Sequence, residues 1–199
     1  MPELTAIILA AGLSRRMGAQ NKLLLPIDGT PMIRHVVSLI SSVCDGQVTV
    51  VTGHQREAVE AALAGLPIAL AHNPDFKRGQ KTSVANGLRT IASAENVMIA
   101  LGDQPRLTRA ALDRLIAGHL TQTSPRITIP IRGGDRGNPI IVPRSLIPRL
   151  LEDSANPGCH RFTRDHPELV NFVPLTDPGF FSDIDTPADF EELTAEAVP

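Results

Sequence analysis

The chain is poor in aromatic side chains and has no strong excess of either charge. Aromatic residues make up 3% of its 199 residues, and Trp and Tyr are absent. Single-stranded nucleic acids bind by stacking on such rings, so a site of that kind is not expected. The formal net charge of −2 gives no basic surface of the sort that nucleic acids or membrane surfaces attract. We therefore expect neither as a partner.

Cysteines and long apolar runs are also scarce. The two cysteines, Cys44 and Cys159, lie far apart and belong to no CxxC pair, which argues against a zinc site or a disulfide framework and for reduced thiols. The N-terminus lacks a basic segment followed by a long apolar core, and no apolar run approaches about 18 residues. These absences predict a cytoplasmic protein.

The first half of the chain alternates short apolar segments with amphipathic ones. Runs of β-branched and apolar residues predict strands at 5–9, 48–52, 68–71 and 97–101. Helices are predicted at 31–43, 55–64, 82–92 and 109–120. Thr30 and Thr108 are the expected N-caps of two of them, with Pro31 at a first helical position. This alternation predicts a three-layer α/β fold, a mostly parallel sheet flanked by helices, with ligands at the carboxyl ends of its strands.

The second half is less regular. Strands are predicted at 126–131, 139–142 and 169–173, and helices at 145–151, 159–165 and from 186 onward. The last helix has Thr186, Pro187 and Asp189 in the order typical of a helix start. Because no repeat, low-complexity stretch or long linker interrupts the chain, we expect a single domain over 1–199.

The loop after the first predicted strand carries the strongest chemical signal. Small residues at 10–12 precede Arg15 and Arg16, and Lys22 follows shortly afterwards. Small side chains let backbone N–H groups approach an anion, and the cations supply its countercharge. The P-loop spacing and the dinucleotide-binding GxGxxG pattern are both absent. The loop is therefore predicted to hold a nucleoside triphosphate in another way, the alternative being a solvated basic loop.

A second motif, Gly102-Asp103-Gln104-Pro105, directly follows the strand predicted at 97–101. The carboxyl end of a central strand is where open α/β sheets bind ligands. A carboxylate there suits Mg²⁺, which takes one or two protein carboxylates together with substrate phosphates. Asp103 is thus predicted to be a metal ligand, and Thr108 is better placed to cap the following helix.

Two further segments carry polar groups that a ligand could use. In an extended 183–187 segment, Asp183 and Asp185 would face the same side, where either could approach a metal; for Asp185, a capping role is an equal alternative. Between the third strand and its helix, Thr82 or Ser83 is expected to cap that helix, whose N-terminus would attract an anion. An exposed basic loop with an ordinary cap is the alternative there. The six histidines show no metal-binding spacing.

Together these motifs resemble those of the MobA-like nucleotidyltransferases, and among them the molybdenum cofactor cytidylyltransferases (MocA). The resemblance covers nearly the whole chain. It rests on Leu-Ala-Ala-Gly-x-Ser-x-Arg-Met-Gly at 9–18, Asn-Lys-Leu-Leu at 21–24, Gly-Asp-Gln-Pro at 102–105 and Asp-Ile-Asp-Thr-Pro at 183–187. Asn73-Pro74, Gly79, Ser83 and Gly137-x-Pro139 also match. The Ala-Ala-Gly opening is more similar to the cytidylyl than to the guanylyl enzymes.

The resemblance implies the Rossmann-like fold of the nucleotide-diphospho-sugar transferase type. The N-terminal half would bind the nucleotide and the C-terminal half the acceptor. The implied reaction is a Mg²⁺-dependent transfer of CMP from CTP to Mo-molybdopterin, giving molybdopterin cytosine dinucleotide and pyrophosphate. Because a phosphate is already a competent nucleophile, this in-line displacement needs positioning and charge neutralisation and no general base. A molybdoenzyme or its maturation chaperone would be the recipient of the product.

The resemblance also implies a role for each residue of this chain that matches a functional position of the family. The catalytic residues would be Arg16 and Lys22, which stabilise the triphosphate and the leaving pyrophosphate, and Asp103. The metal ligands would be Asp103 and Asp183. Nucleotide contacts would come, besides Lys22, from Leu9, Ala10, Ala11, Gly12, Asn73, Gly79, Ser83 and Gly102.

The chain departs from the subfamily pattern at Lys81, Thr82, His160 and the pair Phe162-Thr163. These positions fall in the regions expected to face the acceptor. Alternative functions are therefore a related transferase that uses GTP or another nucleotide, or one with a sugar- or polyol-phosphate acceptor. A non-enzymatic alternative is a chaperone that binds the molybdenum cofactor.

Overall fold

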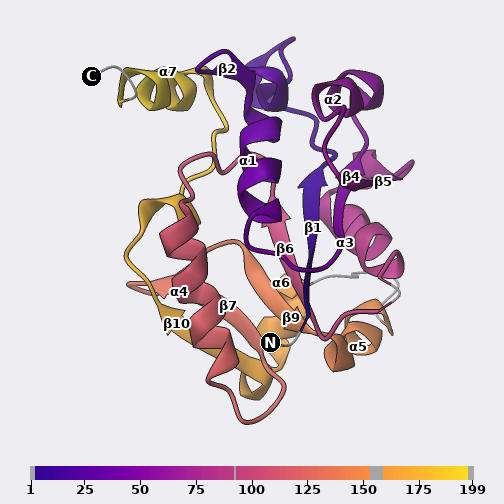
Figure 1. Ribbon diagram of the computed structural model, residues 1–199, viewed down its shortest axis with the longest axis vertical. Helices are drawn as coiled ribbons and strands as arrows, with labels where there is room; N and C mark the ends of the chain where they lie inside the picture. The colour runs from indigo at the N-terminus through magenta and orange to yellow at the C-terminus, as the bar shows by residue number, and fades with distance from the viewer. Residues whose placement is uncertain (1–2, 92, 153–158, 197–199) are drawn as a thin grey trace.

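A mixed sheet forms the centre of the computed structural model, which describes residues 3–91, 93–152 and 159–196 (Figure 1). The strand order is β10-β7-β9-β6-β1-β4-β5, with β8 paired along β7. The strands are β1 (Leu4–Ala10), β4 (Val48–Thr52), β5 (Ala69–His72), β6 (Asn96–Leu101), β7 (Ile127–Arg132), β8 (Asp135–Arg136), β9 (Ile140–Pro143) and β10 (Val170–Pro174).

Most neighbouring strands run parallel, as the sequence predicts. Strand β1 lies parallel to both β4 and β6, with Ile7 opposite Thr49 on one side and Ile99 on the other. The strand pairs β4–β5 and β7–β10 are also parallel. Strand β9 is antiparallel to β6 and to β7, so the sheet is mixed on that side. The mostly parallel α/β architecture is confirmed.

Helices cover both faces of the sheet, giving three layers. One face carries α1 (Met32–Ser41), α2 (Arg56–Ala62) and α4 (Arg109–Leu120). The other face carries α3 (Gln80–Arg89), α5 (Ile147–Glu152) and α6 (Cys159–Asp165). No helix in the described part of the chain has the length and apolar character needed to cross a membrane.

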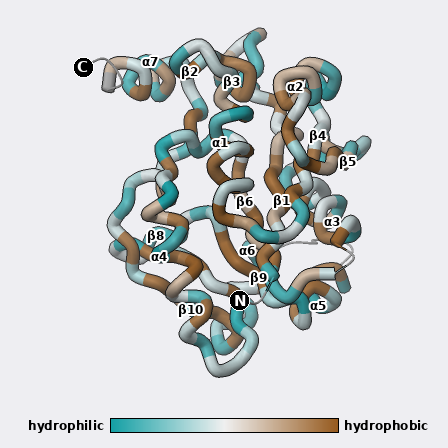
Figure 2. Tube along the Cα trace, viewed as in Figure 1, coloured by the Kyte–Doolittle hydropathy of each residue, from teal (hydrophilic) through white to brown (hydrophobic). Residues whose placement is uncertain are grey.

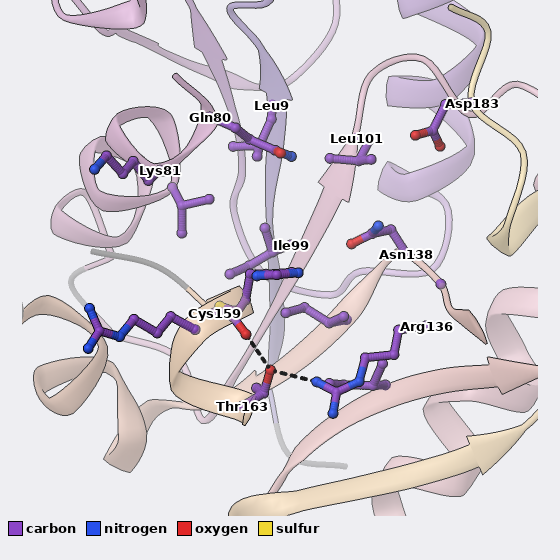
Figure 3. A pocket seen from close by; sticks show the side chains of 16 residues that line it. Leu9, Gln80, Lys81, Ile99, Leu101, Arg136, Asn138, Cys159, Thr163 and Asp183 are labelled. Atoms are coloured by element: carbon purple, nitrogen blue, oxygen red, sulfur yellow. Dashed lines mark hydrogen bonds between the residues drawn. The ribbon is translucent and has the colours of Figure 1, made fainter. Parts of the chain in front are cut away.

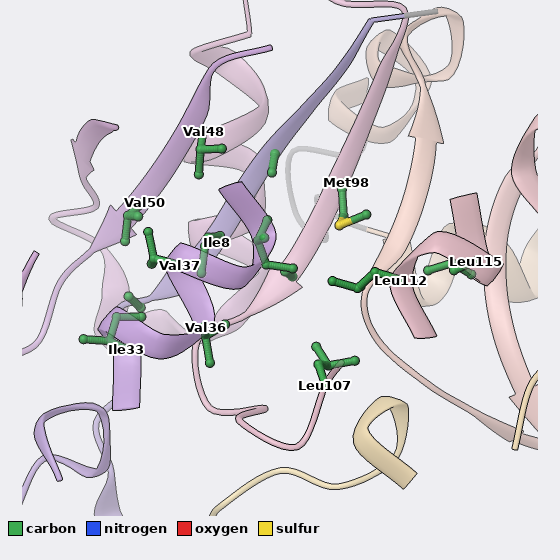
Figure 4. Close-up of a cluster of buried hydrophobic side chains, with 14 of the residues drawn as sticks. Ile8, Ile33, Val36, Val37, Val48, Val50, Met98, Leu107, Leu112 and Leu115 are labelled. Atoms are coloured by element: carbon green, nitrogen blue, oxygen red, sulfur yellow. The ribbon is translucent and has the colours of Figure 1, made fainter. Parts of the chain in front are cut away.

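Strand β1 is buried on both faces and joins the two apolar layers. Ile8 packs with Val36 and Val37 of α1 in the cluster drawn in Figure 4, and the apolar residues of β1 stand out in the interior of Figure 2. On the opposite face Ile7 meets α3, where a Cβ on Gly87 would lie 2.5 Å from the Ile7 Cγ2 atom. The absence of a side chain at Gly87 therefore lets α3 pack close to the sheet.

The expected N-cap of the first helix is wrong. Thr30 and Pro31 form strand β3 (Thr30–Pro31), antiparallel to β2 (Pro26–Ile27). The two strands are joined by Asp28 and Gly29, whose φ angles of 48° and 76° are typical of the tight type I′ hairpin turn. Because hairpin pairing extends through Pro31, helix α1 begins one residue later, at Met32.

Two other helix starts differ in detail. Helix α3 begins at Gln80 after Gly79, so Thr82 and Ser83 lie inside the helix and do not cap it; its predicted end at residue 92 lies outside the described residues. The helix predicted at 145–151 is divided in the structure into the 3-10 turn η4 (Arg144–Leu146) and helix α5.

Short 3-10 turns connect several of the main elements. Besides η4, they are η1 (Arg15–Met17), η2 (Lys22–Leu24), η3 (Phe76–Arg78), η5 (Pro167–Leu169) and η6 (Pro178–Phe180).

The last helix, α7 (Pro187–Glu196), begins as the sequence predicts. Thr186 Oγ1 accepts a hydrogen bond from the Asp189 backbone N–H at 3.2 Å, and Asp189 Oδ2 accepts one from the Thr186 N–H at 2.7 Å. This reciprocal capping box satisfies N–H groups at the helix start. Leu193 of α7 packs with Ile184 and Met32 in a small separate cluster, which fixes the C-terminal segment beside the start of α1.

Candidate active site at the carboxyl ends of the strands

A cavity of about 540 Å³ lies where β1 and β6 end. Its wall includes the loop at 11–16, the start of α3, and three aspartates that follow β6 or precede α7. The predicted site residues that line it are Leu9, Ala11, Gly12, Arg16, Lys22, Gly79, Ser83, Asp103 and Asp183. Residues from both ends of the chain thus meet at one edge of the sheet, which is the expected position for a ligand.

The loop after β1 is held by side chains that also orient Lys22. Asn21 Oδ1 accepts a hydrogen bond from the Leu23 N–H at 3.1 Å, and Ser14 Oγ accepts one from the Lys22 N–H at 3.3 Å. Gly12 faces open space, since no atom lies within 4 Å of the Cβ position that a larger residue would have. Backbone at Gly12 is therefore accessible to a ligand in the cavity.

Two cations and two carboxylates form a continuous cluster in this cavity. Lys22 Nζ lies 2.5 Å from Asp103 Oδ2 and 2.7 Å from Asp185 Oδ1. Arg16 Nη2 lies 2.6 Å from the other Asp185 oxygen. Burial acts to lower the pKa of Lys22, but the two adjacent carboxylates outweigh that effect and raise the pKa. Lys22 is therefore a protonated, positively charged ammonium group at the cavity wall.

Asp103 is positioned by close packing around Gly102. The Gly102 N–H donates to the Leu9 carbonyl at 3.0 Å, and a Cβ at Gly102 would lie 2.7 Å from Ile33 Cδ1. The Asp103 carbonyl accepts from the Ile184 N–H at 3.0 Å, which ties the end of β6 to the segment before α7. Gly102 therefore brings the loop into place by packing, and it does not itself line the cavity.

The third aspartate, Asp183, lies beside these groups on the wall of the cavity. Asp183 is exposed as a residue, while its surroundings still partly desolvate its carboxyl group. This desolvation, together with the negative charges of Asp103 and Asp185, raises the pKa of Asp183 to about 6. Crowded carboxylates of this kind favour either a proton or a cation between them.

The donor set fits a divalent cation that also binds phosphate. Asp103 Oδ1 is buried and has no hydrogen-bond partner among the described residues, and Asp183 supplies a second carboxylate nearby. In the described ranges no group of three or more His, Cys, Asp or Glu residues is arranged to hold a metal ion. Two carboxylates are nevertheless the number that Mg²⁺ usually takes from a protein when substrate phosphates complete its coordination.

Three of the predicted nucleotide contacts do not line the cavity. Ala10 is buried in β1, and Gly102 is packed as described above. Asn73 is also buried: its Nδ2 donates to Thr82 Oγ1 and Ser83 Oγ, each at 2.9 Å, and its Oδ1 accepts from the Asp75 N–H. Asn73 therefore fixes the start of α3, through which Gly79 and Ser83 reach the cavity.

Asp185 has a role that sequence reasoning left open. Its carboxylate pairs with Arg16 and Lys22, whereas the capping bonds at the start of α7 are made by Thr186 and Asp189. The capping alternative for Asp185 is thus not observed. Arg16 and Asp185 are 169 positions apart in the chain, so no local sequence pattern indicated this contact.

A second cavity of about 430 Å³ adjoins the first on the side of β7, β9 and α6 (Figure 3). The two cavities share Leu9, Gln80, Leu101 and Asp183. Arg136, Asn138 and Thr163 line the second cavity and were not predicted as site residues. The only sequence signals near them were the Gly137-x-Pro139 match and the departures from the family pattern at His160 and Thr163.

The fold of this chain is similar to that of solved structures that include a nucleotidyl transferase. A nucleotidyl transferase from Methanothermobacter superposes with a TM-score of 0.82 at 24% identity, over 98% of this chain and 97% of that one. CMP:2-keto-3-deoxy-manno-octonic acid synthetase in complex with CTP gives 0.73 at 16% identity, over 98% of both chains. These likenesses define the fold class.

Residues 6–170 match the MobA-like NTP transferase domain, and the chain belongs to this family. Among curated relatives, nicotine blue oxidoreductase of Paenarthrobacter nicotinovorans is 27% identical over 197 residues, 94% of each chain. The bifunctional protein GlmU of Halorhodospira halophila is 37% identical over 113 residues. That match covers 56% of this chain and only 24% of GlmU.

Proposed function

We propose that the chain transfers CMP from CTP to the phosphate of Mo-molybdopterin, releasing pyrophosphate. The observation that carries this proposal is the meeting of Lys22, Arg16, Asp103 and Asp183 in one cavity that adjoins a second cavity. A transferase needs two adjacent substrate sites with charge-neutralising groups at their junction. The choice of CTP rests on the Ala10-Ala11-Gly12 opening, and that of the acceptor on the resemblance of the chain to the molybdenum cofactor cytidylyltransferases.

The chain's own groups would act by positioning and charge compensation. The backbone of the loop at Gly12 and the start of α3 would hold the triphosphate, and Lys22 and Arg16 would stabilise negative charge on the departing pyrophosphate. Asp103 and Asp183 would hold Mg²⁺, which neutralises phosphate charge when it is bound. Asp183 lines both cavities, which supports a role for its carboxylate at the point where the acceptor phosphate would approach the α-phosphorus. No side chain needs to remove a proton, because the attacking phosphate is ionised.

This proposal divides the chain into two functional halves of a single domain. The N-terminal half would bind the nucleotide through the loop after β1 and the start of α3. The C-terminal half would bind the acceptor through β8, β9 and α6, and a molybdoenzyme or its maturation chaperone would receive the product. Asp183 and Asp185 cross this division, since they come from the C-terminal segment and line the nucleotide cavity.

The experiment is pyrophosphate release with Mg²⁺ and Mo-molybdopterin, run in parallel with CTP, GTP, UTP and ATP. Release with CTP alone is expected. A preference for GTP would support the transfer reaction but would show that the nucleotide is GTP and not CTP. If a folded sample releases pyrophosphate with none of the four, the acceptor is wrong, and sugar and polyol phosphates are then tested as acceptors.

The name of one relative supplies a second candidate. The Paenarthrobacter protein is called an oxidoreductase and matches over 94% of this chain. Reduction of a substrate requires an electron donor, and NADH or NADPH oxidation can be followed by absorbance. The sequence lacks the GxGxxG pattern of dinucleotide-binding sites, so we expect no oxidation of either donor when nicotine blue, the compound in the relative's name, is supplied as the electron acceptor. Oxidation without pyrophosphate release would favour this second function.

A further inference from the structure

The second cavity has an apolar floor and a polar rim. The floor is formed mainly by Leu9, Val84, Ile99, Leu101, Ile129 and Ile140. Arg136, on the rim, projects from the two-residue strand β8, which is paired only with β7. Figure 3 shows Arg136 and Asp183 at different ends of the cavity. A molecule whose phosphate lies beside Asp183 would therefore extend its remaining part toward Arg136.

Arg136 is held in place by two neighbours. Its Nη1 donates to Thr163 Oγ1 at 3.1 Å, and its guanidinium carbon lies 5.0 Å from the centre of the Phe172 ring. Thr163 is itself buried, and its hydroxyl donates to the His160 carbonyl at 3.3 Å. Because the side chain is tethered from α6 and supported by β10, its orientation is largely set before a ligand arrives.

The guanidinium retains unused hydrogen-bonding capacity. Arg161, on the same rim, pairs with Asp165 at 3.2 Å, whereas Arg136 forms no ion pair with any carboxylate of the described ranges. A guanidinium has five N–H donors in a planar fork that matches two acceptors side by side. An uncompensated arginine held at a cavity wall is suited to bind a ligand group of that shape.

We propose that Arg136 binds the hydrogen-bond-accepting edge of the acceptor substrate, remote from its reacting phosphate, and that Thr163 is the positioning residue for Arg136. This inference rests on the proposed transfer reaction. The acceptor class it defines is a phosphomonoester with a flat ring system, whose face can lie on the apolar floor, and with carbonyl or anionic oxygens at its far edge. A small sugar phosphate would place hydroxyl groups against the apolar floor and would offer the Arg136 guanidinium a poorer set of acceptors.

The test compares Arg136→Ala, Arg136→Lys and Thr163→Val with the wild type, using Mo-molybdopterin as the acceptor probe. Arg136→Ala is expected to raise the KM for the acceptor at least about tenfold, the loss typical of a charge-assisted hydrogen bond, while the KM for CTP stays within about twofold. Arg136→Lys keeps the positive charge without the planar guanidinium, so its KM for the acceptor should lie between those of Arg136→Ala and the wild type. Thr163→Val should raise the acceptor KM by a smaller factor, and Thr163→Ser should restore it.

Arg126→Ala is the matched control, because Arg126 is an exposed arginine that precedes β7 and lines neither cavity. An unchanged acceptor KM in Arg136→Ala, with wild-type turnover intact, overturns this inference and leaves the transfer reaction standing. If the wild type shows no turnover, acceptor binding measured by calorimetry decides separately. Binding that is weakened in Arg136→Ala supports the inference, and equal or absent binding in the two proteins rejects it.

Discussion

The two oxygens of Asp103 have different surroundings. Oδ2 pairs with Lys22 at 2.5 Å, while Oδ1 is buried without a hydrogen-bond partner in the described chain. A buried acceptor with no donor costs free energy unless a ligand supplies the missing contact. A cation that bridges Asp103 and the phosphates would supply it. Oδ1 of Asp103 is therefore the atom at which we expect a divalent cation to bind.

We predict that Asp103→Asn lowers the rate of pyrophosphate release by at least about a hundredfold, the scale seen when one electrostatic group of an active site is removed. The fold should be retained, because the amide has the same shape and Lys22 keeps Asp185 as a partner at 2.7 Å. Pyrophosphate release and thermal unfolding, measured on the same samples, check both statements. Asp103→Ala is expected to behave in the same way.

Glu57→Gln is the control for the loss of one negative charge, since Glu57 is exposed on α2 away from the site. Its turnover should match the wild type. Turnover that is also unchanged in Asp103→Asn would reject Asp103 as a metal ligand.

Helix α4 is joined to the sheet by a buried polar network around His119. Its Nε2 bonds Asn96 Oδ1 of β6 at 2.8 Å, and its Nδ1 lies 2.7 Å from Thr128 Oγ1 of β7 and 2.9 Å from Gln122 Nε2. Because Asn96 Oδ1 can only accept, Nε2 carries the proton and Nδ1 is the acceptor. A second proton on Nδ1 would point at the donating amide of Gln122, so the network fits the neutral ring.

We predict that this network makes the fold sensitive to acid. Burial lowers the pKa of His119 below its ordinary value of 6.5. As the pH falls below about 6.5, the unfolded chain binds a proton that the folded chain resists, so the free energy of unfolding decreases. His119→Gln cannot titrate, and its urea midpoint should therefore fall less than that of the wild type between pH 7 and pH 5.

His166→Gln is the comparison variant, because the half-buried His166 ring lies 3.2 Å from Glu168 and beside the Phe162 ring, outside the network around His119. Its midpoint should follow the wild-type pH dependence. If His119→Gln follows it too, the ring of His119 is not what makes the fold acid-sensitive.

Elements whose signals are local could be predicted, and contacts between distant segments could not. Thr108 and the Thr186–Asp189 pair cap their helices as expected, because a cap depends on residues three positions apart. Thr30 has an equally good cap signal, but the Asp28-Gly29 turn and its hairpin pairing override it. Asn73 was expected to contact the nucleotide, yet its buried amide is used to hold Thr82 and Ser83.

For the site as a whole, Arg16, Lys22 and Asp103, which the motifs offered as site residues, line one cavity. The partners of those cations were not predictable, because Lys22 and Asp185 are 163 positions apart. Arg136 likewise gains its role only when β8 pairs with β7 and α6 brings Thr163 beside it. Such contacts depend on how distant strands and helices assemble, and a short sequence motif does not predict that assembly.

Segments from the two halves of the chain meet at the wall of the first cavity, where the Asp185 carboxylate bridges Arg16 and Lys22. These are the cations proposed to bind the triphosphate, so an incoming anion has to compete with Asp185 for them. We predict that Asp185→Asn binds inorganic tripolyphosphate about three- to tenfold more tightly than the wild type in metal-free buffer, because a competing ion pair of modest strength is removed. The gain should shrink at high salt, which screens the partly exposed Arg16.

Calorimetry of tripolyphosphate binding checks this, with Asp113→Asn as the control: Asp113 pairs with Arg109 at 3.8 Å on the exposed side of α4, and its loss changes the net charge by the same amount. The control should bind as the wild type does, since long-range charge alone is largely screened. Equal or weaker binding by Asp185→Asn would show that Asp185 holds Arg16 and Lys22 in the binding geometry. In that case this contact would prepare the cavity for the triphosphate, and binding would not need to break it.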